Sequence, residues 1–287
     1  MPSVRQISRR IRSVQNTAKI TKAMSMIAAS KLRRSQDAAT QGRAYADSMA
    51  AMVSNIIGQS QNDESTQLLM QEREIRNRGL VLITPDRGLT GGLNANLIRA
   101  ASDFIDGEGS TVKVVAVGKK GLDFSRRNNL EVLGETTGLT DRPTPNDTRS
   151  VSNIMINSFD EGIVDSFHIV YAQFVNTTVQ RAVTNQLVPV VVEEDSSGSS
   201  GTGYIYEPSA DGVLSELLPR YVQTLVHHAV LEGNASEQSA RMVAMNQATD
   251  NANAMVDDLT LLMNKIRQET ITKELLDIVG GVAALEN

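Results

Sequence analysis

Apolar residues recur at helical spacing near both ends of this chain. Near the N-terminus, Ser3 stands where a helix cap is expected. The residues after it repeat at intervals of four and three: Ile7, Ile11, Val14 and Ala18, with Ile20, Met24 and Ile27 continuing on a shifted stripe. Near the C-terminus the spacing is that of a coiled-coil seam and runs through Ala252, Val256, Leu259, Met263, Ile266 and Thr270. The pattern predicts one long amphipathic helix at each end.

The positions of the prolines set how long these helices can be. All seven fall at positions 2, 85, 143, 145, 189, 208 and 219, and a proline costs about 3 kcal/mol inside a helix. A helix over residues 3–57 would be about 80 Å long and one over 210–285 about 110 Å, whereas a compact globule of this length is roughly 50 Å across. At least one helix must therefore project. We expect the two to pair antiparallel, because each apolar stripe needs a partner.

The middle of the chain follows a different pattern, in which short β-branched runs alternate with helical stretches. The predicted strands are Gly79–Thr84, Thr111–Val117, Phe167–Phe174 and Leu187–Val192, and the predicted helices are Leu93–Ile105 and Thr148–Gly162. The expected fold class is α/β plus long helices. Its parts are an antiparallel coiled coil of the N-terminal helix (residues 1–60) and the C-terminal helix (210–287), and a central Rossmann-like α/β domain (78–208) with a largely parallel sheet.

Composition excludes several kinds of chemistry. The chain has no cysteine, so disulfides, thiolate metal sites and a cysteine nucleophile are excluded. Only three histidines are present, and the adjacent His227 and His228 would point to different faces of a helix, so no metal site is expected. No apolar run approaches the ~18–20 residues of a membrane span, and the basic N-terminus lacks the apolar stretch of a signal peptide. We therefore expect a cytoplasmic protein.

Charge is distributed unevenly along the chain. Residues 1–34 hold nine of the 28 Lys and Arg residues and none of the 33 acidic residues. Such asymmetry is typical of a surface for nucleic acid or for an acidic partner, and the acidic residues of 251–287 modestly suit it. A coiled-coil nucleic-acid binder is one alternative, although the basic residues are not interleaved with aromatics and no reading motif is present.

The stretch LITPDRGLTGGLNANLIRA, residues 82–100, is the candidate nucleotide site. A predicted strand leads into Gly88, Gly91, Gly92 and a helix, which is where a dinucleotide-binding unit holds pyrophosphate. The glycines read G-x-x-G-G rather than G-x-G-x-x-G, however, and no clear acidic residue closes a second strand. We interpret the stretch as a structural turn and expect no cofactor and no catalytic residue. A nucleotide-dependent oxidoreductase is the other alternative.

Four motifs, in order along the chain, resemble the gamma subunits of F-type ATP synthases. RIRSVQNTAKITKAMSMIAASKLRRSQ (10–36) is similar to the family's N-terminal helix and DRGLTGGLN (86–94) to its central domain. ARMVAMNQATDNA (240–252) and NKIRQETITKELLDIVGGVAAL (264–285) are similar to its C-terminal helix. The resemblance agrees with the coiled coil and the Rossmann-like domain expected above.

The resemblance implies a rotor that is not itself catalytic. Such a subunit stands inside a ring of three alpha and three catalytic beta subunits, contacts the epsilon subunit, and rests on a membrane-embedded ring of c subunits. It couples ion-driven rotation of that ring to ATP synthesis or hydrolysis, and it reaches the membrane only through the ring. It binds no nucleic acid. A bacterial protein, peripheral at the cytoplasmic face of the plasma membrane, is expected.

The resemblance also implies contact residues. Lys22, Met24, Arg241, Arg267, Gln268 and Thr272 match positions that face the catalytic subunits. Val279, Val282 and Leu285 match the tip, which is seated in an apolar sleeve, and Tyr204, Tyr206 and Glu207 match the foot near the c ring and epsilon. Val282 replaces the family's alanine, which puts the local packing of the tip in doubt.

Overall fold

A computed structural model describes residues 3–59, 68–107, 109–191, 207 and 209–285, with the backbone alone for residues 58–59 and 280–285. The elements are α1 (Val4–Gln59), a 3₁₀ helix (Leu68–Met70), β1 (Asn77–Ile83), α2 (Leu93–Asp106), β2 (Thr111–Val117), α3 (Lys119–Arg127), β3 (Glu131–Thr136), α4 (Pro145–Asp160), β4 (Ser166–Phe174), β5 (Gln180–Val188) and α5 (Ala210–Leu285). Both long terminal helices are thus confirmed, with 56 residues in α1 and 76 in α5.

Ser3 caps α1 as predicted. The backbone N–H of Gln6 donates to Ser3 Oγ (3.3 Å), and the backbone N–H of Ser3 donates to Gln6 Oε1 (2.9 Å). This reciprocal pair is a capping box, which satisfies two donors that the first helical turn leaves without intrahelical partners.

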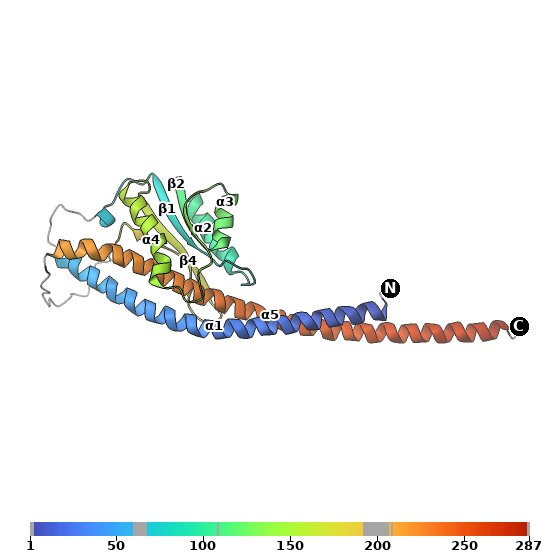
Figure 1. Cartoon of the computed structure of the whole chain (residues 1–287). Coiled ribbons are helices and arrows are strands. Elements are labelled where there is room, and N and C mark those ends of the chain that lie inside the picture. The colour runs from blue at the N-terminus through green and yellow to red at the C-terminus, as the bar shows by residue number, and fades with distance from the viewer. Residues whose placement is uncertain (1–2, 60–67, 108, 192–206, 208, 286–287) are drawn as a thin grey trace. The chain divides into compact units, whose positions relative to one another are not determined.

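The five strands form one sheet in the order β3-β2-β1-β4-β5 (Figure 1). β1 pairs in parallel with both β2 and β4, and β2 pairs in parallel with β3. β5 joins the edge of the sheet antiparallel to β4. The predicted Rossmann-like domain with a largely parallel sheet is therefore confirmed, with one antiparallel edge strand.

Alternate residues of the central strands fill two separate cores. Leu80 and Leu82 of β1 pack with Leu97 of α2 on one face of the sheet. Val81 and Ile83 pack on the other face in a cluster that also contains residues of α4 and the first half of α5. In Figure 1, α2 and α4 accordingly lie on opposite sides of the sheet. Because both faces are covered, the central strands are almost continuously apolar, as parallel sheets require.

The chain divides into two compact units. One unit contains residues 1–27 and 242–287, the ends of the two long helices. The other contains residues 28–241, which comprise the α/β domain with the remaining parts of α1 and α5.

Buried residues of α1 follow the four-three spacing over its whole length. They are Ile7, Ala18, Thr21, Ser25, Ala28, Leu32, Ser35, Ala39, Ala46, Met49, Val53 and Ile56. The predicted shifted stripe is wrong, because Ile20 is 61% exposed, Ile27 is 58% exposed and Met24 is only half-buried. The seam passes instead through the hydroxyls of Thr21 and Ser25, which have partners on α5. Spacing, and not hydropathy, defines the buried face here.

The predicted strand Leu187–Val192 is also largely wrong, because β5 begins at Gln180 and ends at Val188. β3 and the nine-residue α3 were not predicted at all. The strands β3 and β5 lie at the two edges of the sheet, where polar residues are common. The segments QRAVTNQLV and EVLGET accordingly lack the apolar run that identifies a central strand.

Gly118, between β2 and α3, provides a test of this packing. It has φ +96°, and a Cβ at this position would overlap the carbonyl group of Thr84. We expect Gly118→Ala to lower the free energy of unfolding by at least about 2 kcal/mol, measured as a lower denaturant midpoint. Gly88→Ala is the matched control, since a Cβ there would meet nothing within 4 Å. Equal midpoints for the two variants would contradict this account.

Candidate functional site

The glycine-containing turn after β1 is held by the protein's own side chains. Asp86 accepts hydrogen bonds from the backbone N–H groups of Lys119 and Gly138, each at 2.8 Å. Lys119 begins α3, so this carboxylate occupies a helix N-terminus where an anionic ligand could otherwise bind. Thr84 Oγ1 accepts from the backbone N–H of Gly121 (2.7 Å). These contacts support the interpretation of residues 82–100 as a structural turn.

The two adjacent histidines point to different partners, as predicted. His227 Nδ1 lies 3.3 Å from Thr148 Oγ1 of α4, and His228 Nε2 lies 3.4 Å from Glu232 Oε1 of α5. Burial, followed by the charge of His228, lowers the pKa of His227, although Asp147 opposes this. The described residues contain no group of three His, Cys, Asp or Glu side chains placed to hold a metal ion.

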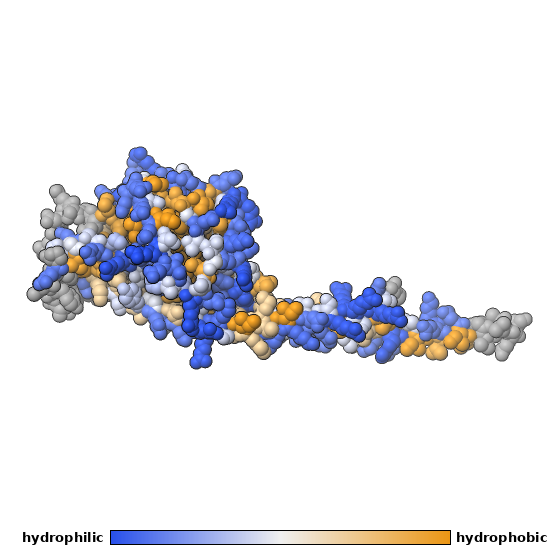
Figure 2. Space-filling model, in the orientation of Figure 1, coloured by the Kyte–Doolittle hydropathy of each residue, from blue (hydrophilic) through white to orange (hydrophobic). Residues whose placement is uncertain are grey.

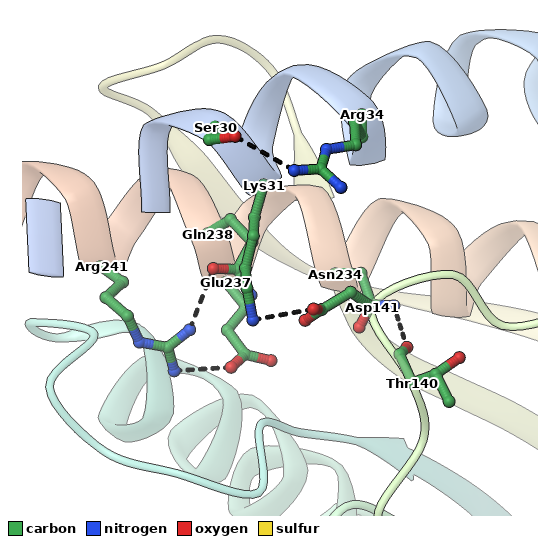
Figure 3. A network of polar contacts seen from close by, with 9 residues as sticks. All are labelled: Ser30, Lys31, Arg34, Thr140, Asp141, Asn234, Glu237, Gln238 and Arg241. Carbon is green, nitrogen blue, oxygen red and sulfur yellow. Dashed lines mark hydrogen bonds and ion pairs between the residues drawn. The ribbon is translucent and has the colours of Figure 1, made fainter. Parts of the chain in front are cut away.

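A polar network joins the loop between β3 and α4 to both long helices (Figure 3). Lys31 of α1 forms a 2.7 Å ion pair with Asp141, and Asn234 of α5 donates to the backbone carbonyl of Thr140 (3.5 Å). An open pocket of about 330 Å³ lies beside this network, lined by Lys31, Arg34, Thr140, Asp141 and Arg142. The network therefore fastens the α/β domain to both helices within one compact unit.

Arg241, a predicted contact residue, belongs to the same region. Its guanidinium forms a 2.6 Å ion pair with Glu237 and donates to Gln238 Oε1 at 3.3 Å (Figure 3). The side chains of Arg241 and Glu237 are only 13% and 17% exposed. Arg241 is thus already paired within the chain, so any contact with another subunit would have to share or replace these partners.

Glu232 of α5 is a buried carboxylate, with a side chain that is 1% exposed. Its Oε1 is paired with Arg43 of α1 and with His228. Burial by itself would raise the pKa of Glu232, but the hydrogen bonds and charges of His228 and Arg43 outweigh burial and lower it. Burial, followed by the charge of Glu232, raises the pKa of Tyr171 of β4 to about 12. The pair between this buried carboxylate and the half-exposed Arg43 therefore joins α1 to α5.

The paired ends of the helices present a basic surface. Arg5, Arg9, Arg10, Arg12, Lys19 and Lys22 of α1 are all exposed. In the described part of the chain, no ion pair joins these cations to the acidic residues of α5. Among the described residues, this face therefore keeps its cations free of ion pairs with α5, which suits an acidic partner.

The contact between Thr21 and Thr249 sets the antiparallel register of the two helix ends. Continued along the helices, this register places Val4, where α1 begins, opposite Ile266. The predicted seam of α5 agrees: Ala252 is buried and Val256 to Ile266 are half-buried at the seam positions, whereas Thr270 is exposed. α5 therefore extends beyond its partner from about residue 267.

Apart from Arg241, the predicted contact and tip residues of α5 lie on this unpaired end. Arg267, Gln268, Thr272 and Val279 are exposed, and every described side chain from 267 to 279 is exposed. Among them are the large apolar residues Ile271, Leu275, Leu276, Ile278 and Val279. Figure 2 shows this apolar surface beside the grey C-terminal atoms. Val282 and Leu285 lie in the helix, but their side chains are outside the described residues.

The other predicted residues do not join one site. Lys22 is exposed and Met24 is half-buried on α1, and the register places them opposite residues near Asn246, about 30 Å along the axis from Arg267. Tyr204 and Tyr206 lie outside the described residues, and Glu207 is exposed. The predicted contacts thus lie at separate positions along the helix axis, which we call levels.

Sequence reasoning missed the polar residues that join the two helices: Thr21, Ser25, Arg43, Glu232, Asn246 and Thr249. For Thr21, Ser25 and Thr249 a signal was present, because they continue the four-three spacing of each seam. For Arg43 and Glu232 the sequence carries no comparable signal, since their pairing depends on how α1 and α5 meet.

Comparisons with known proteins cover nearly the whole chain. The family model described as "ATP synthase" matches residues 3–285. An ATP synthase gamma chain of Dehalococcoides mccartyi is 47% identical over 285 residues, which is 99% of this chain and all of that one. The gamma chain of Chloroflexus aurantiacus is 46% identical over 289 residues, covering 99% of both chains.

Solved structures show the same fold. A chain of the Euglena gracilis mitochondrial ATP synthase, in a structure of OSCP, F1 and c-ring, matches with a TM-score of 0.68 and 20% identity, over 98% of this chain and 94% of that one. A chain of the central stalk and c-ring of the Tetrahymena thermophila enzyme matches with a TM-score of 0.59 and 22% identity, over 80% and 99% respectively. Within the described residues, no helix combines the length and apolar character needed to cross a membrane.

The buried carboxylate of Glu232 predicts a change in stability that depends on pH. Because the pKa of Glu232 is lowered, its contribution to stability is complete above its ordinary pKa of about 4.3 and is lost as the pH falls through the lowered value. Arg43→Met removes one of the two partners of the buried carboxylate, so we expect a loss of about 1–3 kcal/mol at pH 7, measured by denaturant unfolding.

The double variant Arg43→Met/Glu232→Met removes both charges and should recover most of that loss, since apolar residues of similar volume replace a buried pair at little cost. Arg33→Met, which removes an exposed arginine of the same helix, is the control. If Arg43→Met and Arg33→Met had equal effects, the pair would not hold the helices together.

Proposed function

Because this chain belongs to the gamma-chain family of ATP synthases, we propose that it is the central-stalk rotor of an F-type enzyme. In this role it couples rotation of an ion-driven c ring to the synthesis or hydrolysis of ATP on neighbouring catalytic beta subunits. The chain itself is a non-catalytic subunit. Its partners are a ring of three alpha and three beta subunits, the epsilon subunit and the c ring.

The unpaired end of α5 supports this proposal most directly. About 19 residues, 267–285, extend beyond the last described residue opposite them on α1, a length of roughly 28 Å. Single helices of this kind are marginal in water, and this one exposes Leu275, Leu276 and Ile278. An exposed apolar surface of this size needs a partner. We assign the tip, with Val279, Val282 and Leu285, to an apolar sleeve formed by the surrounding ring.

The mechanism follows from contacts made at different levels of an asymmetric stalk. Lys22 and Met24 form one level, and Arg267, Gln268 and Thr272 form another, about 30 Å away. In a ring of three catalytic subunits, a single stalk presents a different face to each. A contact that is stronger in one conformation of a catalytic subunit shifts that subunit's equilibrium by the difference in affinity. Rotation then takes each site through its conformations in turn.

The basic face of α1 fits such a role. Its exposed cations, including Arg9, Arg12 and Lys19, have no acidic partner among the described residues of α5. Acidic surfaces of the surrounding subunits would complement them, and nucleic acid is not required to explain the charge. We also assign Arg241 to contacts with the catalytic subunits, where its guanidinium would be held in place by the ion pair with Glu237.

The remaining assignments concern the foot and the location. We assign Tyr204, Tyr206 and Glu207 to contacts with the c ring and epsilon, so that the chain reaches the membrane only through the ring. The relatives named above are bacterial, which supports a peripheral position on the cytoplasmic face of a plasma membrane. In this assignment, residues 1–60 and 210–287 form the stalk, and residues 78–208 form the domain attached to it.

Removing residues 268–287 tests the proposal. These residues include the whole unpaired apolar end of α5 but none of the α/β domain. We expect lower torque in ATP-driven rotation and a lower ratio of ATP made to ions moved, because the stalk loses the apolar end that seats it in the surrounding ring. The unfolding transition of the α/β domain should stay unchanged. Normal coupled synthesis by the truncated complex would count heavily against the proposal.

Paired substitutions separate apolar seating from helix length. Leu276→Ser with Val279→Ser should reproduce part of the defect, because both side chains are exposed and apolar. Glu274→Ser with Asp277→Ser changes exposed polar residues of the same turns and should have little effect. If the two variants behave alike, the tip is not held by apolar contacts.

A further inference from the structure

Two buried polar contacts join α1 to α5 where the helix ends are paired. Thr21 Oγ1 lies 2.7 Å from Thr249 Oγ1, and Ser25 Oγ donates to Asn246 Oδ1 at 2.6 Å. Thr21, Ser25 and Thr249 are each no more than 9% exposed. All four residues belong to the same compact unit of the chain. Hydroxyls at seam positions are unusual, since coiled coils favour apolar residues there.

The Thr21–Thr249 contact depends on the register of the two helices. The hydroxyl of Thr249 donates to the backbone carbonyl of Met245 (2.8 Å). Its oxygen is therefore free to accept from Thr21. Thr21 has an alternative acceptor on its own helix, the carbonyl of Ala18 at 3.1 Å. Both hydroxyls can thus be satisfied within their own helices in any register, but the bond between the helices forms only in one.

The apolar part of this seam does not select a register strongly. With Thr21 opposite Thr249, the antiparallel arrangement places Ala18 opposite Ala252 and Ile11 opposite Leu259. A slip of seven residues would again bring seam positions together, with Thr21 opposite Val256 in one direction and Met242 in the other. Small residues such as alanine form shallow knobs, so the packing lost by such a slip is limited.

We infer that Thr21, Ser25, Asn246 and Thr249 are positioning residues that select the register of the paired helix ends, in addition to the Arg43–Glu232 pair formed by the same two helices. Because both threonine hydroxyls have acceptors on their own helices, only the bond between Ser25 and Asn246 is gained in this register. One hydrogen bond of about 1 kcal/mol favours the register about five-fold. A slip of one heptad would displace Lys22 and Met24 by about 10 Å relative to Arg267. In the rotor proposed above, on which this second half of the inference rests, the two levels of contacts would then no longer meet the catalytic subunits at the correct heights.

The absence of cysteine makes the register directly measurable, because introduced cysteines are the only labelling sites. Asn16 and Asp277 are exposed positions on the two helices. Spin labels at Asn16→Cys and Asp277→Cys should lie about 35 Å apart in the observed register, and about 24 or 45 Å apart after a slip of one heptad in either direction. Electron–electron double resonance on the full-length chain, alone and in the assembled complex, resolves these distances.

The test variant is Thr21→Val/Ser25→Ala/Thr249→Val, which removes the hydroxyls at nearly constant volume. We expect helix content and melting temperature to be unchanged or higher, because apolar replacement of a buried polar pair is close to neutral. The distance distribution should nevertheless broaden to include the 24 or 45 Å population, and ATP synthesis per ion moved should fall. Thr21→Ser/Thr249→Ser keeps both hydroxyls and should restore the single distance.

Thr17→Val/Thr260→Val is the matched control, since these hydroxyls bond only to carbonyls of their own helices. A single distance of about 35 Å in the test variant would overturn the assignment of register to these residues. A slipped register with normal coupling would overturn their positioning role. Failure of the labelled wild-type chain to couple would instead concern the proposed rotor function and leave the distance result intact.

Discussion

The antiparallel seam between α1 and α5 is the constraint on which the rest of the structure depends. On α1 it keeps one four-three spacing from Ile7 to Ile56, with residues that are mostly small. Small side chains let two helices approach closely, and the polar groups among them are paired: Thr21 with Thr249, Ser25 with Asn246, and Arg43 with Glu232. The result within each compact unit is a pair of closely packed helices whose outer faces stay available for other proteins.

The α/β domain is attached to both helices of this seam. Its turn after β1 has the outline of a phosphate loop, but the side chains of Thr84 and Asp86 at the start of the turn bind backbone N–H groups of α3 and of Gly138. The domain is instead bound to both helices, through the apolar core around Leu218 and Val222 and through the Lys31–Asp141 pair. A fold that elsewhere binds dinucleotides can serve as a rigid attachment, because function depends on the site and not on the fold.

Sequence reasoning succeeded where a single physical signal was strong. The central strands β1, β2 and β4 are buried on both faces, so their apolar runs were found almost to the residue. The edge strands β3 and β5 were missed or misplaced because one side of an edge strand meets solvent. The seam of α1 was lost after Ala18, where Thr21 and Ser25 replace apolar residues. Individual contact residues came from family resemblance, since exposed side chains such as Gln268 leave no pattern in the sequence.

Direct observation of rotation tests the central claim. Arg149→Cys, on an exposed position of α4, would carry a single optical probe on an otherwise cysteine-free chain, with the catalytic ring fixed to a surface. On addition of ATP we predict stepwise rotation of the probe in one direction, at a rate that follows ATP hydrolysis. Full hydrolysis by the complex while the probe remains stationary would contradict the account.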